Sequence, residues 1–154
     1  EVSPRRGGTA GGTTVTITGT GFGATTADNS VTIAGSECII QSASTTQIVC
    51  VTEAHQGSTK TKVRVDVGDQ GIATQDNADY WYIDRWSSVF TWGGGPLPEA
   101  GDFVVVPAGQ TLLLDTDTPV LKMLLIEGGE LIFDEQDVEL QAENILITDG
   151  GLLQ

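Results

Sequence analysis

Apolar and polar residues alternate along most of the first half of the chain. Val15 and Ile17 fall on one side of an extended segment, with threonines on the other side, and Val31 and Ile33 repeat this arrangement. The stretch TKVRVDV at residues 61–67 alternates valine with charged side chains. Such alternation indicates strands with one buried and one solvated face. Because turn residues separate these runs, residues 1–84 are predicted to form an antiparallel, immunoglobulin-like β-sandwich.

The pattern changes after residue 92, where the predicted strands become nearly all apolar. The runs are FVVV, LLL, LKMLLI, ELIF and ENILI, and glycine recurs between them at Gly109, Gly129 and Gly150. A repeat of about 20 residues built from strands and turns favours the rungs of a parallel β-helix, or solenoid. An ordinary sandwich with evenly spaced hairpins is the alternative, and LKMLLI could also form one buried helical turn. The predicted fold class is therefore all-β.

Charge separates the two halves further and excludes some partners. The 154-residue chain has a net charge of −14, and residues 85–154 contain only Arg85 and Lys122 as basic residues. So acidic a surface repels nucleic acid and anionic lipid, which are bound mainly through lysine and arginine. The remaining basic residues, Arg5, Arg6, Lys60, Lys62 and Arg64, lie in a half that is itself acidic. Nucleic acid is therefore not an expected partner.

Two glycine-rich stretches resemble nucleotide-binding loops at first sight. GTGFG at residues 19–23 lacks the third glycine and the following helix of a dinucleotide fingerprint. WGGGPLPEAGD at residues 92–102 lacks the Lys-Ser/Thr of a phosphate loop, and its tryptophan and prolines are poor choices for a flexible tether. We interpret the second stretch as the entrance to a second domain, near residue 85.

The residues around that entrance have predicted structural roles. Trp86 is expected to anchor the approach from the first domain, and Trp92 is expected to cap the first rung. Glycine lets the backbone turn beneath the second ring and start the first buried strand. The glycines assigned to these turns are Gly93, Gly94, Gly95 and Gly101.

Acidic residues are the only candidates for a metal site. Asp115 and Asp117 alternate on one side of a strand, and Asp134 and Asp137 lie in the acidic run FDEQDVEL. Calcium binding needs several oxygens converging on one point, whereas a solvated acidic rim would only keep the protein soluble. His55, the single histidine, lies in a polar turn with no second histidine or nearby cysteine pair for zinc, and no nucleophile-elbow motif supports a catalytic triad. No cofactor and no enzymatic activity are therefore expected, and calcium is the one ion to test.

The two cysteines lie in consecutive predicted strands. A turn-like QSASTTQ separates the strand of Cys38 from that of Cys50, so the two side chains could meet across a hairpin. The residues alone leave a disulfide and two buried free thiols open.

The first half resembles a TIG (IPT) domain. Pro4, the block GGTAGGTTVTITGTGFG at residues 7–23, and the later VTIAGSECII and TQIVCVT carry this resemblance. The spacing of Cys38 and Cys50 is similar to that in extracellular members of the family. The resemblance therefore implies a Cys38–Cys50 disulfide in residues 1–84.

The second half resembles the start of a G8 domain. The resemblance rests on Trp86 and Trp92, the stretch from GGGPLPEAGD to GGELIF, and AENILITDGGLL. It runs to the last residue but stops before the usual length of the family. We therefore expect residues 85–154 to be the N-terminal part of that domain, and the chain to be a piece of a longer protein.

The tandem of a TIG and a G8 domain resembles the ectodomain of fibrocystin-like (polyductin-like) receptors. This resemblance implies a non-catalytic structural or interaction module, on the extracellular side of the plasma membrane or its cilia, anchored through a segment outside this sequence. Its implied partners are neighbouring TIG and β-helix domains, other extracellular proteins or glycans. Some G8 proteins are hyaluronidases, which makes hyaluronan binding or hydrolysis the alternative, although the acidity of residues 85–154 opposes an anionic substrate.

Overall fold

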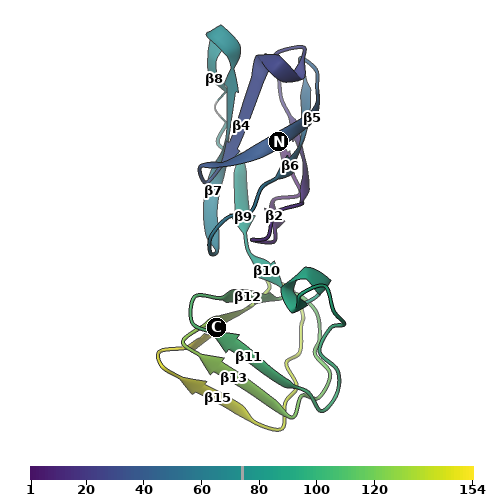
Figure 1. Ribbon diagram of the computed structural model, residues 1–154, viewed down its shortest axis with the longest axis vertical. Helices are drawn as coiled ribbons and strands as arrows, with labels where there is room; N and C mark the ends of the chain where they lie inside the picture. The colour runs from purple at the N-terminus through teal and green to yellow at the C-terminus, as the bar shows by residue number, and fades with distance from the viewer. Residues whose placement is uncertain (74) are drawn as a thin grey trace. The chain divides into compact units, whose positions relative to one another are not determined.

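Strands make up most of the regular structure in both halves, so the all-β prediction is confirmed (Figure 1). The structure, a computed structural model, describes residues 1–73 and 75–154. The chain divides into two units, Glu1–Tyr82 and Ile83–Gln154, whereas the sequence placed the division after residue 84. None of the helices in the described residues is long and apolar enough to cross a membrane.

The first unit is the predicted sandwich. Its strand β5 (Ser36–Ala43) joins the two layers, because its first residues pair with β4 (Asn29–Ile33) and the rest pair with β6 (Gln47–Thr52). One layer has the order β1-β3-β6-β5 and the other β5-β4-β7-β9-β2, with β8 added to β7. The other elements are β1 (Val2–Ser3), β2 (Arg6–Gly7), β3 (Thr14–Thr18), η1 (Thr26–Asp28), β7 (Thr59–Val67), η2 (Gly68–Gln70), β8 (Gly71–Ala73) and β9 (Asp79–Tyr82).

The alternating residues fill the space between these layers, as their period predicts. Val15 and Ile33 are fully buried, and the valines of β7 face the same core. One pairing differs from the antiparallel prediction, since β2 runs parallel to β9. Strands β1 and β2 have two residues each, which is too short for any alternation to be visible in the sequence.

The disulfide between Cys38 and Cys50 is confirmed. It connects β5 to β6 with a Cα–Cα distance of 5.4 Å, and both cysteines are buried in the core of the sandwich. The bridge therefore closes the hairpin through its apolar face, where Ile40 pairs with Cys50 across the ladder.

The second unit contains two ladders of parallel strands. One has the order β10-β12-β14-β16 and the other β11-β13-β15 (Figure 1). LKMLLI contributes a strand rather than a helical turn. The elements are β10 (Asp84–Arg85), η3 (Val89–Trp92), β11 (Phe103–Pro107), β12 (Thr111–Leu114), β13 (Met123–Glu127), β14 (Glu130–Phe133), β15 (Ile145–Thr148) and β16 (Leu152–Leu153).

Equivalent apolar residues stack on one another along both ladders. Val106 pairs with Ile126, which pairs with Ile147, and in the other ladder Leu112 pairs with Leu131. The inward side chains of the two ladders, together with Trp86 and Leu121, form one buried cluster. Because β-branched and leucine side chains stack in register, each strand is placed by the strand before it.

We predict that the Cys38–Cys50 bridge is the main covalent stabiliser of the sandwich. Replacing both cysteines by alanine should lower the free energy of unfolding of the first unit by about 3 kcal/mol, because a loop of this size is no longer closed in the unfolded state. Native-state hydrogen exchange at the amides of β5 and β6 measures this change, and reduced wild-type protein should match the variant. A loss below about 1 kcal/mol would contradict the prediction.

Candidate functional site

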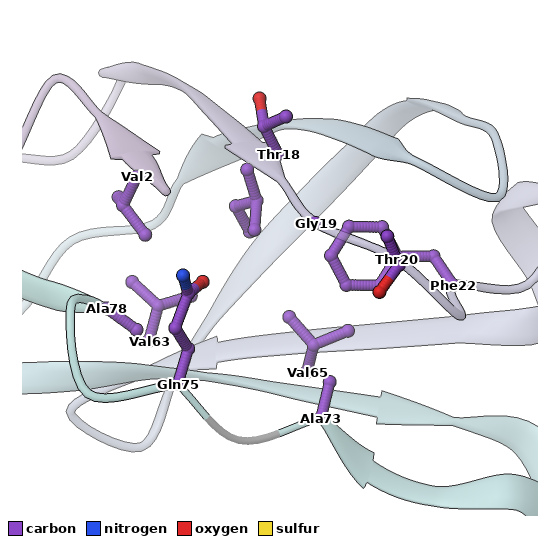
Figure 2. Close-up of a pocket in the computed structure, with 11 residues that line it drawn as sticks. Val2, Thr18, Gly19, Thr20, Phe22, Val63, Val65, Ala73, Gln75 and Ala78 are labelled. Atoms are coloured by element: carbon purple, nitrogen blue, oxygen red, sulfur yellow. The ribbon is translucent and has the colours of Figure 1, made fainter.

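A cavity of about 460 Å³ opens between β3 and β7 in the first unit (Figure 2). Its walls are mostly apolar, and the polar groups that line it come from Thr18, Thr20 and Gln75. None of its described lining residues carries a titratable side chain. The described lining therefore offers threonine hydroxyls and one amide to a ligand, beside a mostly apolar wall.

The GTGFG stretch forms one wall of this cavity. Gly21 has a φ of 77°, the left-handed conformation that glycine tolerates. A Cβ at Gly19 would lie 2.8 Å from Cζ of Phe22, so the missing side chain makes room for that ring. Phe22 in turn is buried against the sandwich core. The glycines of this stretch therefore seat an aromatic ring and do not cradle a nucleotide.

The two predicted structural tryptophans lie together in the second unit. Trp86 is buried, and its ring meets that of Trp92 edge to face with centroids 5.1 Å apart. The indole Nε1 of Trp92 donates a hydrogen bond of 2.8 Å to the Trp86 carbonyl oxygen. This contact holds the turn η3, which has no signal in the sequence, against the core of the ladders.

The glycines after Trp92 complete the turn. Gly93 follows η3 in the left-handed conformation with a φ of 70°, and Gly94 continues it with a φ of 80°. Gly95 lies outside the left-handed region, and its amide approaches the Trp92 carbonyl oxygen. Gly101 has a φ of 87° and donates its amide hydrogen to the Val120 carbonyl oxygen immediately before β11.

The repeated glycines of the ladders have two separate roles. Gly109, Gly128 and Gly150 have φ values of 85°, 71° and 79°, and each lies two residues before the next strand. In the middle repeat the left-handed residue is Gly128, directly before the recurring Gly129. A Cβ at Gly129 would lie 2.4 Å from the Pro107 carbonyl oxygen, so that glycine permits close approach to the preceding turn.

The acidic candidates bond mainly to nearby backbone and side-chain groups. Asp115 accepts hydrogen bonds of 2.9 Å and 2.6 Å from the amide and hydroxyl of Ser87, with the Arg85 guanidinium 3.9 Å away. Asp117 accepts the Glu139 amide hydrogen at 2.8 Å.

The other two candidates lie in the loop after β14. Asp134 accepts bonds from the amide of Glu135 and from Gln136, and Asp137 is exposed. In the described residues there is no group of three or more histidine, cysteine, aspartate or glutamate side chains placed to hold a metal ion.

One aromatic contact has no signal in the sequence. The ring of His55 stacks on Tyr82 with centroids 4.9 Å apart, so His55 is half-buried and not simply solvated as its polar turn predicts. Burial raises the pKa of the Tyr82 hydroxyl to about 12, and the neighbouring Tyr80 adds to this effect. The same hydroxyl donates to the Glu53 carbonyl oxygen at 3.1 Å, which makes the cluster a packing feature.

Comparison with known families and proteins agrees with this architecture. Residues 1–82 match the IPT/TIG domain family and residues 91–154 match the G8 domain family. The chain is 56% identical over 153 residues to human (Homo sapiens) Fibrocystin-L, and 54% identical over 154 residues to the protein of that name from Mus musculus. These alignments cover 99% and 100% of this chain.

Two further similarities are more partial. Fibrocystin from Canis lupus familiaris is 40% identical over 126 residues, covering 80% of this chain and 3% of the relative. The solved extracellular region of plexin A4 aligns with 53% of this chain and 7% of its own length, with 33% identity and a TM-score of 0.47.

The sandwich and the ladders thus define a tandem of two all-β modules. The chain belongs to the IPT/TIG family and continues into a G8 domain. More narrowly, it is a fibrocystin-like fragment, and it spans 4% of the length of the two Fibrocystin-L relatives that it matches.

We predict that Gly129 tolerates no side chain. Gly129→Ala should lower the free energy of unfolding of the second unit by about 1–3 kcal/mol, because its Cβ would overlap the carbonyl oxygens of Val106 and Pro107. Hydrogen exchange at the amides of β11 and β13 measures this loss.

Gly95→Ala is the matched control. A Cβ at Gly95 would lie 3.4 Å from the Trp92 carbonyl oxygen, an ordinary contact, and its backbone is not left-handed. It should change the free energy of unfolding by less than about 0.5 kcal/mol. Equal effects of the two substitutions would contradict the assigned role of Gly129.

Proposed function

We propose that this chain is a non-catalytic structural and interaction module in the extracellular part of a fibrocystin-like cell-surface protein. The observation that carries the proposal is the pair of parallel ladders in the second unit, with inward residues stacked in register. Such an arrangement resists extension along its stack, because each strand is bonded along its length to the next.

In this proposal the ladders are the first rungs of a parallel β-helix. Two parallel sheets that share one core, joined by turns at nearly constant spacing, support this reading. The close approach of Gly129 to the preceding turn at Pro107 also supports the β-helix, because the rungs of a β-helix stack directly on one another.

The surroundings of the candidate residues support a non-catalytic role. The cavity of the first unit contains no titratable lining group among those described, and Asp115 and Asp117 of the second unit accept hydrogen bonds from the backbone amides of Ser87 and Glu139. The Cys38–Cys50 bridge supports an oxidising, extracellular setting.

The neighbouring domains of the same protein are the partners we propose. An apolar strip lies on the outward face of the ladder β11-β13-β15, where Phe103 is 72% exposed, Leu146 49% and Val105 47%. Exposed apolar strips of this kind are common at contacts between domains. Other extracellular proteins would use the same strip.

Hyaluronan cleavage is the test that separates this proposal from its alternative. The 154-residue chain should not shorten hyaluronan of defined length during prolonged incubation near neutral pH, because the second half offers an anionic polymer only Arg85 and Lys122 as basic residues. Gel electrophoresis of the polysaccharide measures this, with an active hyaluronidase as the positive control. Shortening that requires folded chain would overturn the non-catalytic role.

We also predict that calcium is not required. Titration calorimetry with calcium up to the millimolar range should give no saturable heat, because the four aspartate candidates do not converge. The midpoint of thermal unfolding should be the same in calcium and in chelator. Saturable binding that is lost in Asp134→Asn/Asp137→Asn would establish the metal site instead.

A further inference from the structure

The basic residues of the first unit collect on one face of the sandwich. Lys60, Lys62 and Arg64 alternate on β7 and point away from the core, whereas Val63 and Val65 point into it. Arg5 lies immediately before β2, and β2 and β7 flank β9 on opposite sides. In a chain with a net charge of −14, five of the seven lysines and arginines thus lie in or next to β2 and β7: Arg5, Arg6, Lys60, Lys62 and Arg64.

A groove of about 480 Å³ runs across this face. Its lining includes Arg5, Lys60, Lys62 and Trp81, and its single acidic lining residue among those described is Asp79. The ladder between β7 and β9 sets Lys60 opposite Trp81 and Lys62 opposite Asp79. The groove therefore combines three basic residues in its lining with one indole ring.

The ring at the centre of the groove is held in place. The Trp81 indole Nε1 donates a hydrogen bond of 3.0 Å to the Ser58 hydroxyl, and its backbone amide donates to the Arg5 carbonyl oxygen. The Lys60 ammonium lies 4.1 Å from the centroid of this ring. A fixed indole with an ammonium over its ring sets a positive charge beside apolar ring atoms, which suits a ligand with anionic groups and an apolar side.

The two groove lysines stay available to a ligand. Both are exposed, and the contact of Lys62 with the carboxylate of Asp76 is 4.0 Å long, on an aspartate that is itself fully exposed. Its Nζ also donates to the Asp76 carbonyl oxygen at 3.2 Å. Such surface contacts are weak and readily exchanged for a stronger anion.

Arg64 differs from the groove lysines although it lies on the same strand. Its guanidinium makes two hydrogen bonds of 3.0 Å to the Asp66 carboxylate. This bidentate pairing neutralises its charge, and Arg64 is not part of the groove lining.

We propose that the groove formed by Arg5, Lys60, Lys62 and Trp81 binds a sulfated polysaccharide. The ligand needs closely spaced negative charges to compete with water and with the acidity of the rest of the chain, and sulfate groups supply them. Its sugar rings present apolar faces to the indole. A nucleic acid meets the charge requirement as well, but the disulfide favours an extracellular setting, where sulfated polysaccharides are the abundant polyanions.

This inference rests on the extracellular setting of the proposed function, and it concerns the first unit and not the G8 half. The experiment uses the whole 154-residue chain and size-defined heparin oligosaccharides as the probe. Calorimetry at low salt and at about 0.15 M salt should show saturable binding that weakens as salt rises. Hyaluronan oligosaccharides of equal length, which carry carboxylates but no sulfates, should bind at least about tenfold more weakly.

Single substitutions on β7 give a matched comparison. Lys60→Gln should weaken heparin binding about threefold and Lys60→Gln/Lys62→Gln about tenfold or more, because each removes a charge that faces the groove. Arg64→Gln removes one charge from the same strand and should leave the affinity within about twofold. Circular dichroism melting curves check that each variant remains folded.

Several results would overturn the inference. Absence of saturable heparin binding at low salt would do so. Equal losses of heparin affinity in Lys60→Gln and Arg64→Gln would also do so, because they would indicate nonspecific electrostatic attraction. Equal affinity for hyaluronan would remove the sulfate requirement. Self-association that is lost in Lys60→Gln would mean that the groove holds the acidic surface of a second copy. None of these results bears on hyaluronan cleavage, so failure here is distinct from failure of the structural role.

Discussion

Close approach of backbone at the turns is the constraint on which the second unit depends. A Cβ at Gly129 would lie 2.4 Å from the Pro107 carbonyl oxygen, and one at Gly151 would lie 2.6 Å from that of Ile126. Only glycine lets each turn cross directly over the turn before it. Once the turns are stacked, the strands on either side are placed in parallel register, and Ile126 must lie between Val106 and Ile147.

Several aspartates of the second unit accept hydrogen bonds from backbone amides at its turns. Such bonds give turn amides that have no partner in a strand ladder a protein acceptor. Asp115 bonds the Ser87 amide, Asp117 the Glu139 amide and Asp102 the Glu99 amide. Residues that resemble a metal-binding set in the sequence are thereby distributed over separate loops.

The sequence predicts the features that follow from the alternation of apolar and polar residues within one strand. It does not predict the features that depend on how distant strands pair. Alternation located the longer strands of the sandwich, and the family resemblance indicated the disulfide. The two-residue strands β1 and β2 are too short to show an alternating pattern of apolar and polar residues. Neither the stack of His55 on Tyr82 nor the position of Lys60 opposite Trp81 can be read from spacing, because each depends on how distant segments pair.

The same dependence on register explains how a chain with a net charge of −14 can present a cationic groove. Pairing of β7 with β9 brings Lys60 to Trp81, while Arg5, just before β2, accepts the Trp81 amide hydrogen through its carbonyl oxygen. Charges more than about 8 Å away are largely screened at physiological salt, so distant acids repel an anion less than the groove attracts it. Net charge therefore limits how fast a polyanion approaches, and local register determines whether it is held.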